Sequence, residues 1–125
     1  MARESIAMSA AELRRFLEGI RRVVVATLGP SGEPVGSLAA CALEGEQLVF
    51  ALSDEASRRN VERDPRVCCS TDEYPTYYEI RGMTAHGRAR AVAAPASLSS
   101  VEGECYAIDL DDVVSFDFGK IRDRV

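Results

Sequence analysis

Apolar and β-branched residues gather in short segments that are typical of strands, and only two segments have the spacing of a helix. The strand-like segments cover residues 23–28, 35–43, 47–52 and 66–71, with glycine, proline or acidic residues between most of them. Strands this closely spaced pair with their neighbours in antiparallel fashion, because parallel strands need long crossover connections. The first part of the chain is therefore predicted to be an antiparallel meander.

A longer strand is expected over residues 76–92, followed by a low-complexity linker at 93–104. The apolar positions of this strand change side at Gly82, which favours a bulge or a sharp bend there. After the linker, apolar residues alternate again at 106–110 and 114–118, the last strands of the chain.

Two segments are predicted to be helices. A capping box of Ser9 and Glu12 begins the first helix, residues 9–20, and its apolar residues form one stripe. The second helix covers residues 54–63, with Ser53 as its expected N-cap, and it stops before the Asp-Pro pair that follows.

The whole pattern predicts a single mainly β domain over residues 1–125, closed or nearly closed as an antiparallel barrel of six strands with two short helices. A length of 125 residues suits one domain with one hydrophobic core. The sequence contains no internal repeat.

Charge argues against binding to nucleic acid. The net charge is −5 and there is no basic tail, whereas binding to a phosphate backbone needs clustered lysines and arginines. Arginines gather locally at 58–66 and 81–90, which suits a small anionic ligand better. No apolar run has the length to span a membrane and the N-terminus lacks the apolar core of a signal peptide, so we expect a cytoplasmic protein that acts on a small molecule.

The four cysteines are interpreted as reduced, small core residues; they are Cys41, Cys68, Cys69 and Cys105. Cys68 and Cys69 are adjacent on a strand, so their side chains are expected to point to opposite faces. With one histidine and no Cys-x-x-Cys pair, the chain is not expected to hold a metal ion.

The start of the second helix is the segment with the clearest candidate chemistry. With Ser53 as N-cap, free N–H groups of the first turn and the nearby Arg58 and Arg59 could hold a phosphate or carboxylate. The alternative is a capped helix with solvated arginines. Asp54 and Glu55 favour this alternative, because acidic residues stabilise a first turn and repel an anion placed there.

Three ring-bearing side chains have more than one interpretation. His86 is the single histidine and has no neighbouring relay pattern, which favours a structural role over catalysis or haem ligation. Tyr77 and Tyr78 begin the predicted fifth strand, where one is expected in the core and the other at an interface. A tyrosine ring could instead stack on a planar ligand.

Taken together, these segments resemble the pyridoxamine-phosphate-oxidase-like family of split barrels, which bind FMN or the deazaflavin coenzyme. The resemblance is in VVVATLGPSGEP, in LVFALS followed by RRNVERDPRV, and in EIRGMTAHGRARAV, in that order and spacing. It covers residues 9–118. It implies a six-stranded antiparallel split β-barrel and a homodimer whose cofactors lie between the subunits.

The resemblance also implies site residues. Ser37 would line the cofactor ring, the start of the second helix would face the phosphate, and a tyrosine would approach from the fifth strand. The implied cofactor-binding residues are Ser37, Ser53, Ser57, Arg58, Arg59, Tyr77 and Tyr78. Many members place a lysine and often an arginine in the first helical turns, where this chain has Ser57 and Glu55, so Arg58 or Arg59 would have to replace them.

The leading hypothesis from the sequence is a flavin-dependent oxidoreductase that transfers a hydride to or from a small molecule. FMN is preferred to the deazaflavin coenzyme because an acidic protein is a poor host for a polyglutamate tail, and haem ranks behind both. The first alternative is a flavin- or haem-binding protein without catalysis. The second is a dimeric interaction module without a cofactor.

Overall fold

The computed structural model describes residues 5–76 and 79–122. Within these residues, strands dominate and helices are short. The elements are α1 (Ala10–Gly19), β1 (Arg22–Leu28), β2 (Pro34–Glu44), β3 (Gln47–Leu52), α2 (Glu55–Arg63), β4 (Arg66–Glu73), β5 (Arg81–Arg88), β6 (Arg90–Val92), η1 (Ala96–Leu98), β7 (Glu104–Asp109), β8 (Val113–Asp117) and α3 (Gly119–Arg122).

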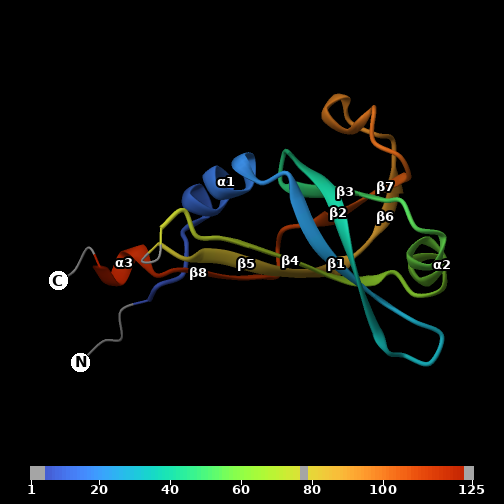
Figure 1. Ribbon diagram of the computed structural model, residues 1–125, viewed down its shortest axis with the longest axis horizontal. Coiled ribbons are helices and arrows are strands. Elements are labelled where there is room, and N and C mark those ends of the chain that lie inside the picture. Colours follow the sequence, from blue (N-terminus) through green and yellow to red (C-terminus); the bar gives the residue numbers. More distant parts are fainter. Residues whose placement is uncertain (1–4, 77–78, 123–125) are drawn as a thin grey trace.

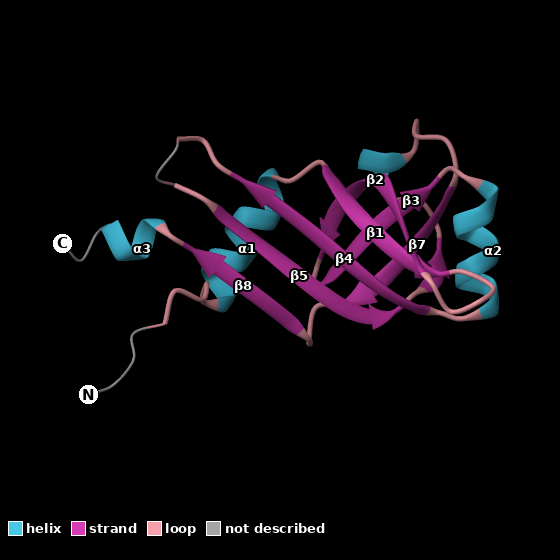
Figure 2. Ribbon diagram, turned by 60° about the horizontal axis from the view of Figure 1, so that its bottom comes forward, coloured by secondary structure: helices cyan, strands magenta, loops and turns pink. Residues whose placement is uncertain are grey.

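The strands form one antiparallel sheet in the order β6-β7-β3-β2-β1-β4-β5-β8. β5 and β6 are separated only by Ala89, yet they lie near opposite ends of this order, so the sheet must curl until its two ends meet. Figures 1 and 2 show the curled sheet. Gly87 permits the closure, because a Cβ at this position would lie 3.0 Å from Cβ of Ile108 on β7.

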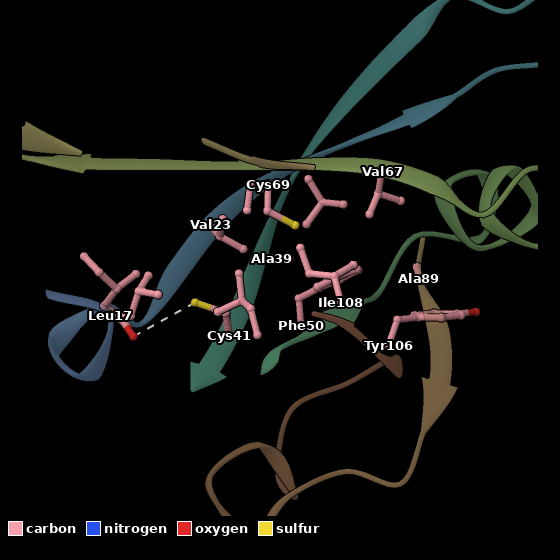
Figure 3. Close-up of a cluster of buried hydrophobic side chains, with 14 of the residues drawn as sticks. Leu17, Val23, Ala39, Cys41, Phe50, Val67, Cys69, Ala89, Tyr106 and Ile108 are labelled. Atoms are coloured by element: carbon pink, nitrogen blue, oxygen red, sulfur yellow. Dashed lines mark hydrogen bonds between the residues drawn. The ribbon is translucent and has the colours of Figure 1, made fainter. Parts of the chain in front are cut away.

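The core fills the inside of the curled sheet. Phe50, Cys69 and Ile108 are fully buried and their side chains point toward one another from β3, β4 and β7 (Figure 3). The ring of Phe50 also stacks on that of Tyr106, with 6.2 Å between centroids. Burying each large apolar side chain stabilises the fold by about 1.5–3 kcal/mol, which is the main force that holds the curled shape.

Helices α1 and α2 lie at opposite ends of the barrel (Figures 1 and 2). The predicted capping box of α1 is confirmed, since Ser9 Oγ accepts from the N–H of Glu12 at 3.2 Å and Ser9 N–H donates to the Glu12 carboxylate at 2.9 Å. Phe16 and Leu17 on one side of α1 are buried in the core. No helix among the described residues is long and apolar enough to cross a membrane.

The predicted antiparallel barrel is confirmed, but the described residues form eight strands and not six. The strand expected over 76–92 is two strands, β5 and β6, with a break at Ala89. No bulge occurs at Gly82, because the β4–β5 register is unbroken along the whole of β5. Glycine is required at this position by packing: a Cβ would lie 2.8 Å from the ring of Phe116 and from the carbonyl oxygen of Thr71.

The segment predicted to be a linker, residues 93–104, packs in part against the sheet. Ala96–Leu98 form the 3-10 turn η1, and Leu98 is buried in a second apolar cluster on the other side of β3 and β7. That cluster contains Val49, Ala51, Leu98, Cys105 and Ala107. The sequence analysis also missed α3, which has only 4 residues and therefore no periodic pattern.

Candidate functional site

The start of α2 is capped by Asp54 and not by the predicted Ser53. Asp54 has an extended backbone, and its carboxylate accepts a hydrogen bond from the N–H of Ser57 at 2.9 Å. Ser53 is exposed one position earlier. Two causes favour the shift by one residue: an ionised carboxylate suits the positive end of a helix, and this register turns Ser57 toward the sheet, where it is 0% exposed.

Ser37, Asp54 and Ser57 form a hydrogen-bonded group that we call the α2 cap network. Ser37 Oγ on β2 donates to Asp54 Oδ1 at 3.2 Å and lies 2.8 Å from Ser57 Oγ. Either hydroxyl can be the donor in the contact between Ser37 and Ser57. Hydrogen bonds from Ser57, and then from Ser37, hold the pKa of Asp54 below its ordinary value.

The two arginines expected at an anion site are directed elsewhere. Arg59 is exposed and pairs with Glu55 one turn earlier, at 2.7 Å. Arg58 Nη1 donates to the carbonyl oxygens of Leu52 and Ser53, at 3.1 and 2.7 Å, and so braces the turn between β3 and α2. The structure thus brings Ser37 and Ser57 together, and it turns both arginines away from them. Tyr77 and Tyr78 lie outside the described residues.

The far end of α2 is held to the sheet by side-chain contacts. Asn60 is 5% exposed, donates to Thr27 Oγ1 at 3.0 Å and accepts from Arg63 at 2.6 Å. Asp64 ends the helix and pairs with Arg66 at 2.6 Å. Hydrogen bonds from Arg66 lower the pKa of Asp64 to about 2. These contacts anchor α2 on β1 and β4.

A second candidate site, which the sequence analysis missed, lies on the outer face of the sheet. Gly36, Ala26, Cys68 and His86 are neighbours across β2, β1, β4 and β5. These four residues face outward, because their neighbours along the strands, such as Cys69 and Ala85, are buried. We call the hollow above this row the outer groove.

The outer groove has a flat apolar floor and polar ends. Its central cavity measures about 220 Å³ and is lined by Ala26, Thr27, Leu28, Pro34, Arg66, Val67, Cys68 and His86. A cavity of about 490 Å³ adjoins it, since Arg66, Val67 and His86 line both, and Arg88, Asp109, Asp111 and Asp112 also line this second cavity. The groove therefore offers an apolar surface for a ring, with charges of both signs beside it.

Cys68 and His86 in the groove differ in how far they are exposed. Burial raises the pKa of the Cys68 thiol, which keeps it neutral and a weak nucleophile. His86 is exposed beside it, and its backbone N–H donates to the carbonyl oxygen of Asp112 at 3.0 Å. The Arg88 side chain is exposed, and its charge acts on the Asp64 carboxylate. Residues 5–76 and 79–122 contain no cluster of three side chains suited to a metal ion.

Sequence reasoning missed the groove because its residues lie far apart in the sequence and become neighbours only when the strands pair. Each of Gly36, Ala26 and Cys68 is an ordinary small residue in its own segment. They become one flat surface only when the strand register is known. The available clue was that outward positions of predicted strands, where polar residues are usual, hold small residues here.

The fold and the sequence both define the class of protein. The family model for pyridoxamine 5'-phosphate oxidase matches residues 9–118. The chain therefore belongs to the pyridoxamine 5'-phosphate oxidase family, and its curled sheet is the split barrel of that family. No curated protein sequence matches the chain.

Solved structures with the same fold have several described functions. A conserved hypothetical protein from Mycobacterium tuberculosis is 23% identical over 98% of this chain and 92% of its own, with a TM-score of 0.79. An FAD-binding protein from Mesorhizobium loti is 15% identical over 89% of this chain and 94% of its own, with a TM-score of 0.72. The haem storage protein HutZ from Vibrio cholerae is 15% identical over 91% of this chain and 96% of its own, with a TM-score of 0.66.

Proposed function

We propose that the protein is an oxidoreductase that uses a flavin, FMN ahead of the deazaflavin coenzyme, and that it works as a homodimer on a small substrate. Family membership supports a flavin in general, because FAD-binding proteins share this fold. The observation that carries the proposal is the outer groove, whose lining includes the small residues Ala26 and Cys68 on neighbouring strands and so leaves room for a planar ring.

The size of the groove supports a homodimer. Ligand pockets usually measure about 300–1,000 Å³ and enclose most of the ligand, whereas the central cavity measures about 220 Å³ and is open on one side. Next to the floor, the same outer face exposes Val24, Leu38 and Val114 by 46, 64 and 67%. Neighbouring exposed apolar residues of this kind mark contact surfaces. A second copy on this face would supply the missing wall.

The apolar lining of the groove suits a ring, whereas the start of α2 does not suit a phosphate. Asp54 already accepts the first-turn N–H there and would repel a second anion. Near the groove, Arg66 is already paired with Asp64, and Arg88 shares the adjoining cavity with Asp109, Asp111 and Asp112, so a phosphate is not favoured there either. When bound, a flavin exchanges a hydride with a substrate, and the protein supplies position and electrostatics.

His86 is the residue of the groove best suited to a proton transfer. An imidazole can donate or accept a proton at Nδ1 or Nε2. Its strand is fixed by the pairing with Cys68 on β4. We therefore expect His86 to hold or move a proton at the edge of the ring. Ala26 and Cys68 would exclude water beneath the ring.

A second candidate function is a binding module without turnover. The closed start of α2 favours it, because that helix end cannot assist in holding a phosphorylated cofactor. In this case the groove would store or sense a planar ligand. An exposed His86 could then ligate haem iron, and added haem would give an absorption spectrum that changes in His86→Ala.

The proposal is tested by titrating the protein into FMN and following the quenching of flavin fluorescence. Ala26→Leu fills the floor of the groove and is expected to weaken binding at least tenfold. Ala91→Leu adds the same volume on exposed β6, away from the groove, and should bind like the unchanged protein. If the protein binds neither FMN nor the deazaflavin coenzyme, or if Ala26→Leu binds as well as Ala91→Leu, the groove is not the flavin site.

A further inference from the structure

The α2 cap network differs from an ordinary helix cap in that it joins two elements. A simple cap needs one side-chain oxygen and one N–H of the first turn. Here both oxygens of Asp54 are used, Oδ2 by the N–H of Ser57 and Oδ1 by the hydroxyl of Ser37 on β2. The Ser57 hydroxyl is also used, since it lies 2.8 Å from Ser37 Oγ. Helix and sheet are therefore joined through one carboxylate.

Three of the groups that would receive a phosphate at this position are already engaged. The N–H of Ser57 and the hydroxyls of Ser37 and Ser57 are bound within the network. The Arg59 guanidinium is paired with Glu55, and Arg58 reaches back to backbone carbonyls. Any phosphate would therefore approach a carboxylate whose neighbouring cations are turned away. Like charges at such short range repel strongly.

We propose that Asp54 acts as an internal replacement for a bound anion and makes this chain select against ligands that place a phosphate monoester at the start of α2. The carboxylate provides the negative charge that the helix end favours, so the network is complete without a ligand. Asp54 is then a specificity-determining residue: it sets which part of a cofactor can be recognised, while the ring is recognised elsewhere.

The direct test uses inorganic phosphate and amide chemical shifts, and it does not depend on flavin binding. In the unchanged protein, the amides of residues 55–58 are expected to show no saturable shift with phosphate. Asp54→Ser keeps a neutral cap and opens space, so the same amides should shift with saturation. Asp54→Asn, which keeps the size and removes only the charge, covers the case in which the serine variant fails to fold.

A matched control separates the role of Asp54 from that of net charge. Glu55→Gln removes one negative charge from the same turn but leaves the cap network in place. It should behave like the unchanged protein. If Glu55→Gln binds phosphate as well as the Asp54 variants do, or if the unchanged protein itself binds phosphate at these amides, the proposal is wrong. It is also wrong if neither Asp54 variant gains phosphate binding.

A second experiment compares FMN with riboflavin, which has the same ring and no phosphate. This arm rests on the proposed flavin function. The unchanged protein should bind both within about threefold, and Asp54→Ser should prefer FMN by at least tenfold. A tenfold preference for FMN in the unchanged protein, located by shifts at residues 55–58, would overturn the proposal. Failure of both flavins to bind would count against the proposed function alone, because the phosphate experiment still decides the role of Asp54.

Discussion

The two polar regions of the molecule, the α2 cap network and the outer groove, differ in how far their polar atoms are satisfied within the chain. In the cap network, each oxygen of Asp54 has a partner and Ser57 is fully buried. In the groove, His86 and Arg88 are exposed, and neither side chain makes a hydrogen bond within the described residues. A region whose polar groups are satisfied serves the fold, and a region with free groups on a flat apolar floor is available to a ligand.

The difference also shows why a helix N-terminus alone is weak evidence for an anion site. The sequence of α2 offers a capped start and two arginines, which fits a phosphate site and a closed cap equally well. The side-chain contacts decide between them, and they favour the closed cap. Substitutions that disturb one region and leave the other intact can sharpen or break this contrast.

The largest expected effect is on assembly at the outer face. Leu38→Glu places a charge on the apolar surface next to the groove and should weaken the proposed homodimer about 100-fold, equivalent to about 2.7 kcal/mol. Sedimentation at several protein concentrations measures this change. Val101→Glu, an exposed apolar residue in the segment after η1, is the control and should leave the mass unchanged. A protein that is monomeric without any substitution would refute the dimer.

The next effect is on stability at the far end of α2. Asn60→Ala removes the partner of Thr27 Oγ1, a buried hydroxyl that is 1% exposed, and should lower the free energy of unfolding by about 2 kcal/mol. Urea denaturation measures the change. Adding Thr27→Val removes the unsatisfied hydroxyl and should recover part of the loss. A double variant that loses the sum of both single effects would show that the two side chains are not coupled.

The cap network should make a smaller, pH-dependent contribution. Asp54→Ala is expected to lower the free energy of unfolding by about 1 kcal/mol at neutral pH. The pKa of Asp54 is lower in the folded than in the unfolded protein, so its charge stabilises the fold fully above the unfolded value, about 3.9. This contribution is lost as the pH falls through the folded value.

Unfolding measured from neutral pH to about pH 2 tests this prediction. The difference between the unchanged protein and Asp54→Ala should shrink in acid, and Asp54→Asn, which can still cap, should be intermediate at neutral pH. A difference that stays constant over the whole range would mean that the carboxylate charge contributes nothing.

The smallest effect is expected in the groove. Cys68→Ala and His86→Gln should each change the free energy of unfolding by less than about 0.5 kcal/mol, because neither side chain makes a hydrogen bond within the described residues. Thermal unfolding measures both. A loss of about 2 kcal/mol or more in either variant would give the groove a structural role and remove the contrast with the cap network.

Much of the fold could be predicted from local patterns. The capping box at Ser9, the hairpin turns and the end of α2 at Asp64 depend on neighbouring residues, so the sequence was sufficient for them. The break at Ala89 and the packing of Leu98 depend on contacts between distant segments. Local periodicity contains no information on such contacts, which explains the errors in strand number and in the linker.

The candidate site was harder to predict for the same reason. The sequence suggested Ser37, Ser57 and the arginines of α2, but it could not show that Ser37 on β2 would reach Asp54 and complete the cap. It gave no sign that Ala26, Cys68 and His86 from three strands would form one surface. Both features arise from strand register.

The central claim is that a flavin is recognised in the outer groove and not at the start of α2. The most direct measurement is a titration of isotope-labelled protein with FMN, followed through backbone amide shifts. We predict saturable shifts at Ala26, Cys68 and His86, with residues 55–58 unchanged. Shifts confined to residues 55–58 would contradict the account, because the phosphate would then bind where Asp54 is proposed to exclude it.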